Sequence, residues 1–189
     1  MPRAGLTSQK VVDEAARVAD EVGWDRLTLA AVAERLGVRL PSLYKHVPSL
    51  EALRAEVRAQ ATRELADALA RSVLGCAGGE ALRNLAAAYR RFARQHPGRY
   101  AATITAPSPD DAEHLAAAAA ALEVIEAALR GYHLEGDDAI DAARALRASL
   151  HGFVHLEAAG GFGLPVDVDR SFARMVDSLD VTLRGWSAA

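Results

Sequence analysis

The sequence has few of the features that define several large classes of protein. It contains one cysteine, Cys76, so no disulfide can form within the chain and the fold does not depend on an oxidising compartment. Only 10 of its 189 residues are aromatic, whereas 42 are alanine, which disfavours a β-sandwich. Its longest apolar run, residues 115–122, is far shorter than the roughly 18 residues that suggest a membrane span. The first ten residues lack the apolar core of a secretory signal, so we expect a cytoplasmic protein with no membrane partner.

Charge is distributed unevenly along the chain. The net charge of −3 argues against a wholly basic nucleic-acid-binding protein. However, residues 35–50 contain Arg35, Arg39, Lys45 and His46 and no aspartate or glutamate. This short acid-free segment is the sharpest charge feature of the sequence.

Apolar residues recur at helical spacing along nearly the whole chain, and no segment shows sustained strand-like alternation. We therefore predict an all-α protein with an N-terminal three-helix domain, residues 1–48, and a C-terminal helical domain, residues 49–189. A connecting helix of about residues 49–74 begins the second domain. The remaining helices are expected near residues 8–22, 29–36, 40–47, 80–95, 98–105, 110–131, 137–159 and 168–187.

Local signals predict where the first two helices end and begin. Gly23 suits a left-handed cap after the first helix. Thr28 is placed to cap the N-terminus of the second helix, with Leu27 and Val32 spaced as a hydrophobic staple around it.

Two short helices joined by a tight turn are predicted within residues 28–46. Ala33 is small where two helices must cross closely, and Gly37 stands four residues later at the turn. The apolar residues that fill the space between the helices are Val32, Leu36, Val38 and Leu43. This is the helix-turn-helix arrangement, in which the second helix must protrude into a DNA major groove about 12 Å wide.

The protruding segment, residues 39–46, combines cationic, hydroxyl and apolar side chains suited to DNA. An arginine can pair with a guanine edge or a phosphate, apolar groups can contact thymine methyls, and side chains at the far end can bind backbone phosphates. The candidate DNA-binding residues are Thr28, Arg39, Leu40, Pro41, Ser42, Tyr44, Lys45 and His46. The alternative is a small helical bundle with a solvated basic face, but the absence of acids and the spacing of small residues favour DNA binding.

The same residues carry a family resemblance. Residues 6–58 include Leu6-Thr7, Leu27-Thr28-Leu29, Val32-Ala33, Leu36-Gly37-Val38, Leu43-Tyr44-Lys45-His46-Val47 and Glu51-Ala52-Leu53, and they resemble the DNA-binding domain of TetR-family transcriptional regulators. The resemblance implies a homodimer that binds a palindromic operator in double-stranded DNA, usually as a repressor, and that releases it when a small molecule enters the C-terminal domain.

Two positions bear on how far the resemblance extends. The segment Pro48-Ser49-Leu50-Glu51 departs from the family pattern, because it lacks the lysine that many members place there for a phosphate. In the C-terminal part, Leu150-His151-Gly152-Phe153 resembles the Trp-His-Gly signature of one subgroup, with leucine in place of tryptophan.

The C-terminal helices carry ordinary apolar stripes, each of which indicates a core more readily than a binding site. A small-molecule pocket between helices is nevertheless a common arrangement, and its candidate lining is Tyr89, Phe92, Tyr100, Ile104, His151 and His155. The last two helices are expected to form a four-helix interface in a homodimer, the alternative being that they only cap a monomer core. The candidate interface residues are Leu150, Phe153, Val154, Phe172, Met175, Val176, Leu179, Leu183 and Trp186.

Other chemistry has little support in the sequence. His151 and His155 are four residues apart, but Glu157 falls on another face, so we expect no metal site. Cys76 has no close cationic neighbour in the sequence that would activate its thiol, so we do not expect it to act as a redox sensor. We find no phosphate loop, nucleophile elbow or acid pair, and so expect no cofactor and no catalytic residues. The second hypothesis is a helical small-molecule-binding protein or enzyme that no longer binds DNA; unlike a regulator, it predicts no salt-dependent affinity for DNA.

Overall fold

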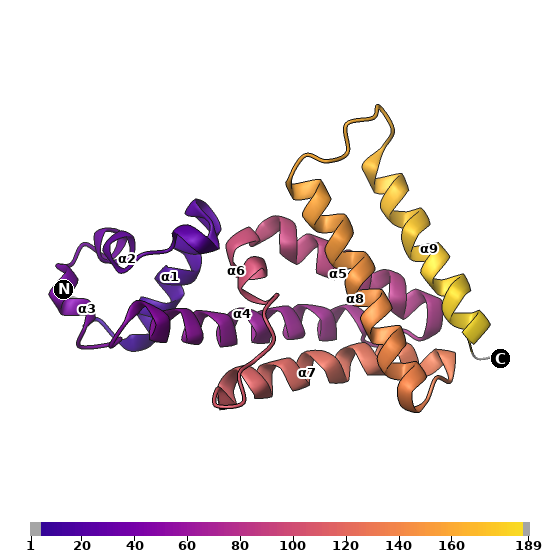
Figure 1. The fold of residues 1–189 in the computed structure, drawn as a ribbon, viewed down its shortest axis with the longest axis horizontal. Helices are drawn as coiled ribbons and strands as arrows, with labels where there is room; N and C mark the ends of the chain where they lie inside the picture. Colours follow the sequence, from indigo (N-terminus) through magenta and orange to yellow (C-terminus); the bar gives the residue numbers. More distant parts are fainter. Residues whose placement is uncertain (1–4, 187–189) are drawn as a thin grey trace. The chain divides into compact units, whose positions relative to one another are not determined.

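The computed structural model describes residues 5–186, and these residues form helices with no strand among them (Figure 1). The prediction of an all-α protein is therefore confirmed. In chain order the elements are α1 Ser8–Val22, the 3-10 turn η1 Trp24–Arg26, α2 Leu29–Leu36, α3 Leu40–Leu43, α4 Leu50–Val73, α5 Gly78–Gln95, α6 Pro97–Ala102, α7 Ala112–Leu129, the 3-10 turn η2 Arg130–Tyr132, α8 Gly136–Ala158 and α9 Val168–Trp186. No helix in this part of the chain has an apolar stretch long enough to cross a bilayer.

Several helix ends differ from the sequence prediction by a few residues, as at α6 and α7. Helix α3 ends at Leu43 and a turn continues to His46, so the protruding helix is a single turn long. Gly23 has φ 95° and ψ 146°, which is a positive φ with an extended ψ rather than the left-handed helical cap that we expected. The predicted end of the last helix at residue 187 lies outside the described residues.

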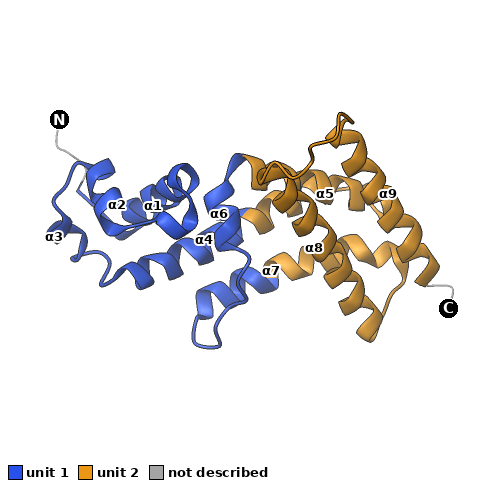
Figure 2. Cartoon of the chain, turned by 45° about the horizontal axis from the view of Figure 1, so that its top comes forward, with its two compact units in different colours: residues 1–64, 95–119 blue, residues 65–94, 120–189 orange. Residues whose placement is uncertain are grey.

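Packing divides the chain into two compact units (Figure 2). Unit 1 comprises residues 1–64 and 95–119, and unit 2 comprises residues 65–94 and 120–189. Helices α4 and α7 each contribute residues to both units. The division does not fall at residue 48, because the first part of α4 and all of α6 pack with the N-terminal helices.

The core of unit 1 joins α1, α2, α3 and the start of α4. Its fully buried members include Val11, Val18, Leu27, Val32, Leu43, Val47, Leu53 and Val57. Helix α6 packs against α1 in the same unit. The contact is so close that a Cβ at Gly98 would lie 2.0 Å from the carbonyl oxygen of Ala19, so only glycine fits at this position.

Unit 2 contains two polar clusters besides its apolar core, one built on the buried Arg90 and the other on the buried pair Tyr132 and Asp180. In the first, Arg90 of α5 donates to Glu157 of α8 at 2.8 Å from Nε, and its guanidinium also lies 2.7 Å from a carboxylate oxygen of Asp169 of α9. In the second, the hydroxyl of Tyr132 donates to Asp180 of α9 at 2.6 Å. Because charged and polar groups are buried only with partners, these clusters fix how the helix ends of unit 2 meet.

We predict that Gly98→Ala destabilises the protein by about 1–3 kcal/mol, because the added methyl group forces α6 away from the backbone of α1. Gly185→Ala is the matched control, since a Cβ at Gly185 of α9 meets no atom within 4 Å. Urea unfolding of both variants measures the difference. Equal effects of the two substitutions would contradict the close contact.

A second prediction concerns pH. The hydrogen bond from Arg90 lowers the pKa of Glu157 below its usual value of 4.5, against the opposing effect of burial. Because this pKa is lower in the folded than in the unfolded chain, Glu157 stabilises the fold above the unfolded pKa, and that stabilisation disappears as pH falls through the folded pKa. We expect Glu157→Gln to be less stable than the wild type by about 1–3 kcal/mol near neutral pH.

The difference in free energy of unfolding between the wild type and Glu157→Gln should therefore depend on pH. Below the folded pKa of Glu157 the wild type has lost the contribution that the variant never had, so the two free energies of unfolding should converge. Unfolding curves recorded between about pH 7 and pH 3 test this. A difference that stays constant over the whole range would show that the charge of Glu157 contributes nothing.

Candidate nucleic-acid interface

The turn between α2 and α3 has the geometry that a helix-turn-helix requires. Gly37 adopts the left-handed conformation, with φ 65° and ψ 32°. The N–H of Gly37 donates to the carbonyl of Glu34 at 3.0 Å, and the N–H of Val38 donates to that of Ala33 at 3.0 Å, so the turn satisfies the last carbonyls of α2. Ala33 is buried, as its position at the helix crossing predicts.

Helix α3 and the turn after it expose most of the candidate DNA-binding side chains. Leu43 is fully buried and anchors the segment to the core. Ser42 and His46 are half-buried, and the backbone carbonyl of His46 accepts a hydrogen bond from Ser8. The exposed members are Arg39, Leu40, Pro41, Tyr44 and Lys45. The segment thus presents two cations, a phenol and apolar groups on a surface to which residues 35–50 add no carboxylate.

Thr28 caps α2 as predicted. Its hydroxyl accepts a hydrogen bond from the N–H of Ala31 at 3.2 Å, and its carbonyl accepts one from Val32. Leu27 and Val32, the two expected staple residues, are fully buried. The side chain of Thr28 therefore stands exposed at the start of α2, in the same unit as α3.

The sequence did not reveal how α4 holds the segment before Thr28. Nη2 of Arg54 donates to the carbonyls of Asp25 at 3.2 Å and Leu27 at 3.4 Å. The guanidinium groups of Arg54 and Arg58 also lie 5.7 and 5.8 Å from the ring centre of Trp24, within cation–π range. Two arginines one turn apart on α4 therefore fix the chain that enters the helix-turn-helix.

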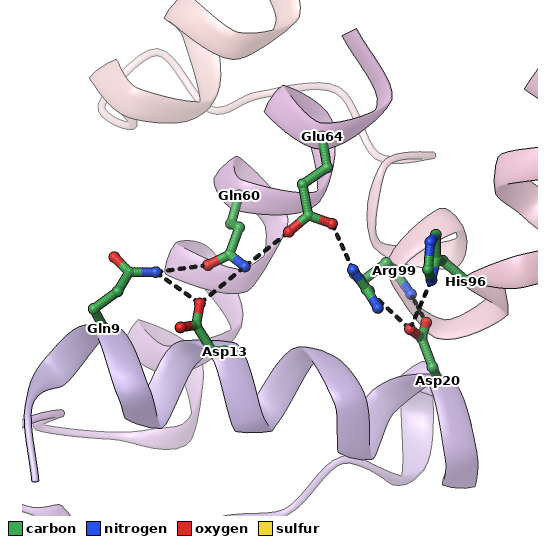
Figure 3. A network of polar contacts seen from close by, with 7 residues as sticks. All are labelled: Gln9, Asp13, Asp20, Gln60, Glu64, His96 and Arg99. Carbon is green, nitrogen blue, oxygen red and sulfur yellow. Dashed lines mark hydrogen bonds and ion pairs between the residues drawn. The ribbon is translucent and has the colours of Figure 1, made fainter. Parts of the chain in front are cut away.

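A polar network links α1 to α4 and α6 (Figure 3). Asp20 at the end of α1 accepts hydrogen bonds from the backbone N–H of Arg99 at 2.8 Å and from its Nε at 2.7 Å, while Nη1 of Arg99 donates to Glu64 at 2.7 Å. His96 lies 3.5 Å from the same Asp20 carboxylate. From Glu64 the hydrogen bonds continue through Gln60 to Asp13 and Gln9. Nothing in the sequence predicted this network, because Asp20 and Arg99 are 79 residues apart.

The N-terminus of α4 is capped by a side chain. In the segment that lacks the family's lysine, residues 48–51, the hydroxyl of Ser49 accepts a hydrogen bond from the N–H of Ala52 at 3.0 Å. This position therefore serves as a helix cap.

The six candidate pocket residues are divided between the compact units. Tyr89, Phe92, His151 and His155 belong to unit 2, whereas Tyr100 and Ile104 belong to unit 1. Tyr89, Phe92 and Tyr100 are buried, and Ile104 is exposed. Their role in binding stays a prediction.

The two candidate histidines of α8 have different surroundings. His151 is half-buried and His155 is exposed, with their ring centres 5.7 Å apart. Burial lowers the pKa of His151, and the nearby charges of His155 and Arg147 lower it further. Residues 5–186 contain no group of three or more histidine, cysteine, aspartate or glutamate side chains placed to hold a metal ion.

The candidate dimer residues fall into two groups. Five of them pack inside the chain with at most 7% of their surface exposed, namely Leu150, Val154, Phe172, Val176 and Leu183. Four are half-buried, namely Phe153, Met175, Leu179 and Trp186. Only the second group has side-chain surface available to another molecule.

Together, a tight helix-turn-helix, a capped α2 and an exposed acid-free α3 define the protein as a DNA-binding regulator. Comparison with known proteins gives the family. The model of bacterial regulatory proteins of the tetR family matches residues 11–57, and the model described as tetracyclin repressor-like, C-terminal domain, matches residues 82–179. The chain belongs to the TetR family of transcriptional regulators.

Individual relatives agree with this assignment. The chain is 41% identical over 174 residues to the HTH-type transcriptional regulator Rv0681 of Mycobacterium tuberculosis, covering 92% of this chain and 79% of the relative. It is 37% identical over 172 residues to the HTH-type transcriptional regulator YobS of Bacillus subtilis, covering 91% and 90%. Its fold is similar to that of a TetR variant from Acinetobacter baumannii AYE solved in complex with minocycline, with TM-score 0.70, 24% identity, and coverage of 98% of this chain and 100% of that one.

The two capping threonines allow a matched prediction for this surface. Thr7 caps α1 through a 3.3 Å bond from Lys10 N–H, as Thr28 caps α2. Replacing either by alanine should lower the free energy of unfolding by about 0.5–2 kcal/mol. If the Thr28 hydroxyl also contacts a phosphate, only Thr28→Ala should weaken binding to DNA.

Fluorescence anisotropy with a labelled mixed-sequence duplex, at a temperature where both variants remain folded, measures the affinity. A mixed-sequence probe suffices, because a phosphate contact acts on every sequence. If Thr7→Ala and Thr28→Ala bind DNA with equal affinity, the Thr28 side chain caps α2 and makes no contact with a phosphate.

Proposed function

We propose that this regulator is a cytoplasmic homodimer that represses transcription by binding a palindromic operator and that leaves the operator when a small molecule binds its C-terminal domain. The observation that carries the proposal is the exposed, acid-free surface of α3 and the following turn, held on the buried side chain of Leu43. An anionic polymer is the partner that such a surface suits best. In this proposal the protein acts by binding and not by catalysis.

We assign the side chains of this surface to two roles, contact with base edges and contact with backbone phosphates. Arg39, Leu40, Pro41 and Ser42 stand at or within α3 and are assigned to base edges. Tyr44, Lys45 and His46 follow α3, and with Thr28 they are assigned to backbone phosphates, which fix the register of the protein on DNA without reading its sequence. The functional boundary is proposed between residues 48 and 49, after the reading segment and just before α4 begins at Leu50.

One α3 of a single turn contacts few base pairs, so specificity requires a second copy. Two-fold-related copies place their reading segments on half-sites about 34–36 Å apart along the DNA. The proposed interface lies on α8 and α9 and uses the candidates that retain exposed surface, Phe153, Met175, Leu179 and Trp186. The five buried candidates support these helices from inside each protomer.

The effector is assigned to unit 2, beside Tyr89, Phe92 and His151. Burial and neighbouring positive charge favour the neutral form of His151, which can both donate and accept a hydrogen bond. The minocycline bound by the structural neighbour shows that the same fold can hold a small molecule in that protein. The Trp-His-Gly subgroup is part of the proposal, based on Leu150-His151-Gly152-Phe153.

The proposed mechanism is a shift between two populations. Effector binding favours a conformation in which α4 holds the two reading segments at a separation that does not match the half-sites. Within unit 1, the contacts of Gln60 with Asp13 and of Arg99 with Asp20 and Glu64 mean that α4 and α6 cannot shift against α1 without breaking hydrogen bonds.

The deciding experiment is to incubate the purified protein with sheared DNA from the genome that encodes it, recover the bound fragments and sequence them. We expect the wild type to enrich fragments that share a palindrome, with affinity falling steeply as salt rises. The double variant Tyr44→Ala/Lys45→Ala should enrich none, while Arg91→Ala, an exposed arginine of unit 2, should behave as the wild type.

The same experiment tests the role of Arg39. If Arg39 pairs with a guanine, Arg39→Ala should bind about 10–100 times more weakly and lose the preference at one base pair of each half-site. An unchanged preference would make Arg39 a phosphate contact. If the wild type enriches no fragment at low or moderate salt, the proposed function is wrong, and the alternative of a small-molecule-binding protein without DNA affinity takes its place.

A further inference from the structure

The segment between α1 and α2 leads directly into Thr28, the cap of α2. Nη2 of Arg54 donates to two carbonyls of this segment, that of Asp25 at 3.2 Å and that of Leu27 at 3.4 Å. The guanidinium of the same arginine lies 5.7 Å from the ring centre of Trp24. One side chain of α4 therefore contacts the segment at three positions just before the cap.

The hydrogen bond to the carbonyl of Leu27 fixes more than Leu27 itself. This carbonyl belongs to the peptide group that also contains the nitrogen of Thr28, and a peptide group is planar. A donor that holds the carbonyl thus holds the Cα of Thr28 in the same plane. The side chain of Leu27 is fully buried, whereas that of Thr28 is exposed. The place of the Thr28 hydroxyl on the surface is therefore determined jointly by the core and by Arg54.

The contacts of Arg54 stabilise the fold less than their number suggests. In the part of the chain that the structure describes, the buried Nε of Arg54 has no hydrogen-bond partner. The same is true of Arg58, whose guanidinium lies 5.8 Å from the ring centre of Trp24. A buried donor without an acceptor costs free energy, which offsets part of what the carbonyl bonds contribute. We therefore expect a substitution of Arg54 to disturb the position of the segment more than the stability of the fold.

We propose that Arg54 is a positioning residue for DNA binding, which holds the peptide group between Leu27 and Thr28 on α4 so that the Thr28 hydroxyl meets a phosphate. The inference rests on the DNA-binding function proposed above and deepens it. Arg54 acts through Thr28, because its Nη2 is already bonded to the two carbonyls. A planar guanidinium can stack on the ring of Trp24 while it donates in its own plane, whereas the ammonium group of lysine cannot do both.

The affinity for a labelled mixed-sequence duplex, measured by fluorescence anisotropy, tests this role. Arg54→Met keeps the apolar stem and Arg54→Lys keeps the charge. We expect each to weaken binding about three- to tenfold, which corresponds to the loss of one hydrogen bond. The control is Arg63→Lys, since Arg63 is an exposed arginine of the same helix that pairs with Glu113 of α7 at 3.5 Å. This variant should bind as the wild type does. Circular dichroism at the assay temperature verifies that every variant is folded.

A double-mutant cycle with Thr28→Ala distinguishes positioning from a general loosening of the fold. If Arg54 acts through the Thr28 hydroxyl, Arg54→Met should weaken binding in the wild type but not in the Thr28→Ala background, because the contact that it positions is already absent there. A structural role alone predicts the same loss of affinity in both backgrounds. That result would overturn the proposal.

The salt dependence of binding distinguishes positioning from a direct contact of Arg54 with DNA. The slope of log affinity against log salt reports how many phosphates are neutralised by cations, so we expect the same slope for the wild type and Arg54→Met. A slope smaller by about one for Arg54→Met, with affinity restored in Arg54→Lys, would make Arg54 itself a phosphate contact and the proposal wrong.

The outcomes also separate this inference from the proposed function. If the wild type binds no duplex, the proposed function and the positioning role are both wrong. If the wild type binds the duplex and both variants of Arg54 bind it equally well, only the positioning role is wrong.

Discussion

The DNA-binding half of this protein depends on one close approach, that of α6 to the end of α1. The carbonyl oxygen of Ala19 occupies the space that a side chain at residue 98 would need, and glycine alone permits the contact. Once the backbones touch, the carboxylate of Asp20 reaches both the backbone N–H and the guanidinium of Arg99. The N-terminal helices therefore form a larger unit than a helix-turn-helix requires, one that includes a helix nearly 80 residues further along the chain.

Arginine has a structural role in this chain that lysine could not fill. The sequence contains 20 arginines and two lysines, a bias that the codon composition of the gene would explain. In the structure, however, Arg54, Arg90 and Arg99 each contact two or more partners, and the partners of Arg90 and of Arg99 lie on separate helices. A planar group with five donors can do this, whereas an ammonium group acts as a single point of charge. These three arginines join α4 to the segment before α2, α5 to α8 and α9, and α6 to α1 and α4.

Much of the fold and part of the candidate site followed from the sequence because they depend on neighbouring residues. Helical periodicity predicted the helices to within a few residues, and Thr28 was identified from the apolar residues around it. The turn at Gly37 was predicted for the same reason, since its geometry is determined over about four residues. Gly23 shows the limit of such signals: a glycine predicts a positive φ but does not determine ψ.

Contacts between residues far apart in the chain could not be predicted from the sequence. The pairs Asp20–Arg99 and Arg90–Glu157 join residues 79 and 67 positions apart, and a single sequence contains no information about which charges meet. The same limitation affected the C-terminal helices. An apolar stripe shows that a helix is buried but not whether its own chain or a second copy covers it, so residues such as Leu150 and Val176 were assigned to an interface although their own protomer encloses them.

The position of Trp24 beside two arginines of α4 gives the protein a built-in optical reporter. Indole emission responds to nearby charge and to exposure, so a change in the distance between α4 and the segment before α2 alters the spectrum of Trp24. The other tryptophan, Trp186, belongs to unit 2. Because each compact unit contains one indole, the loosening of either unit can be followed spectroscopically without an added label.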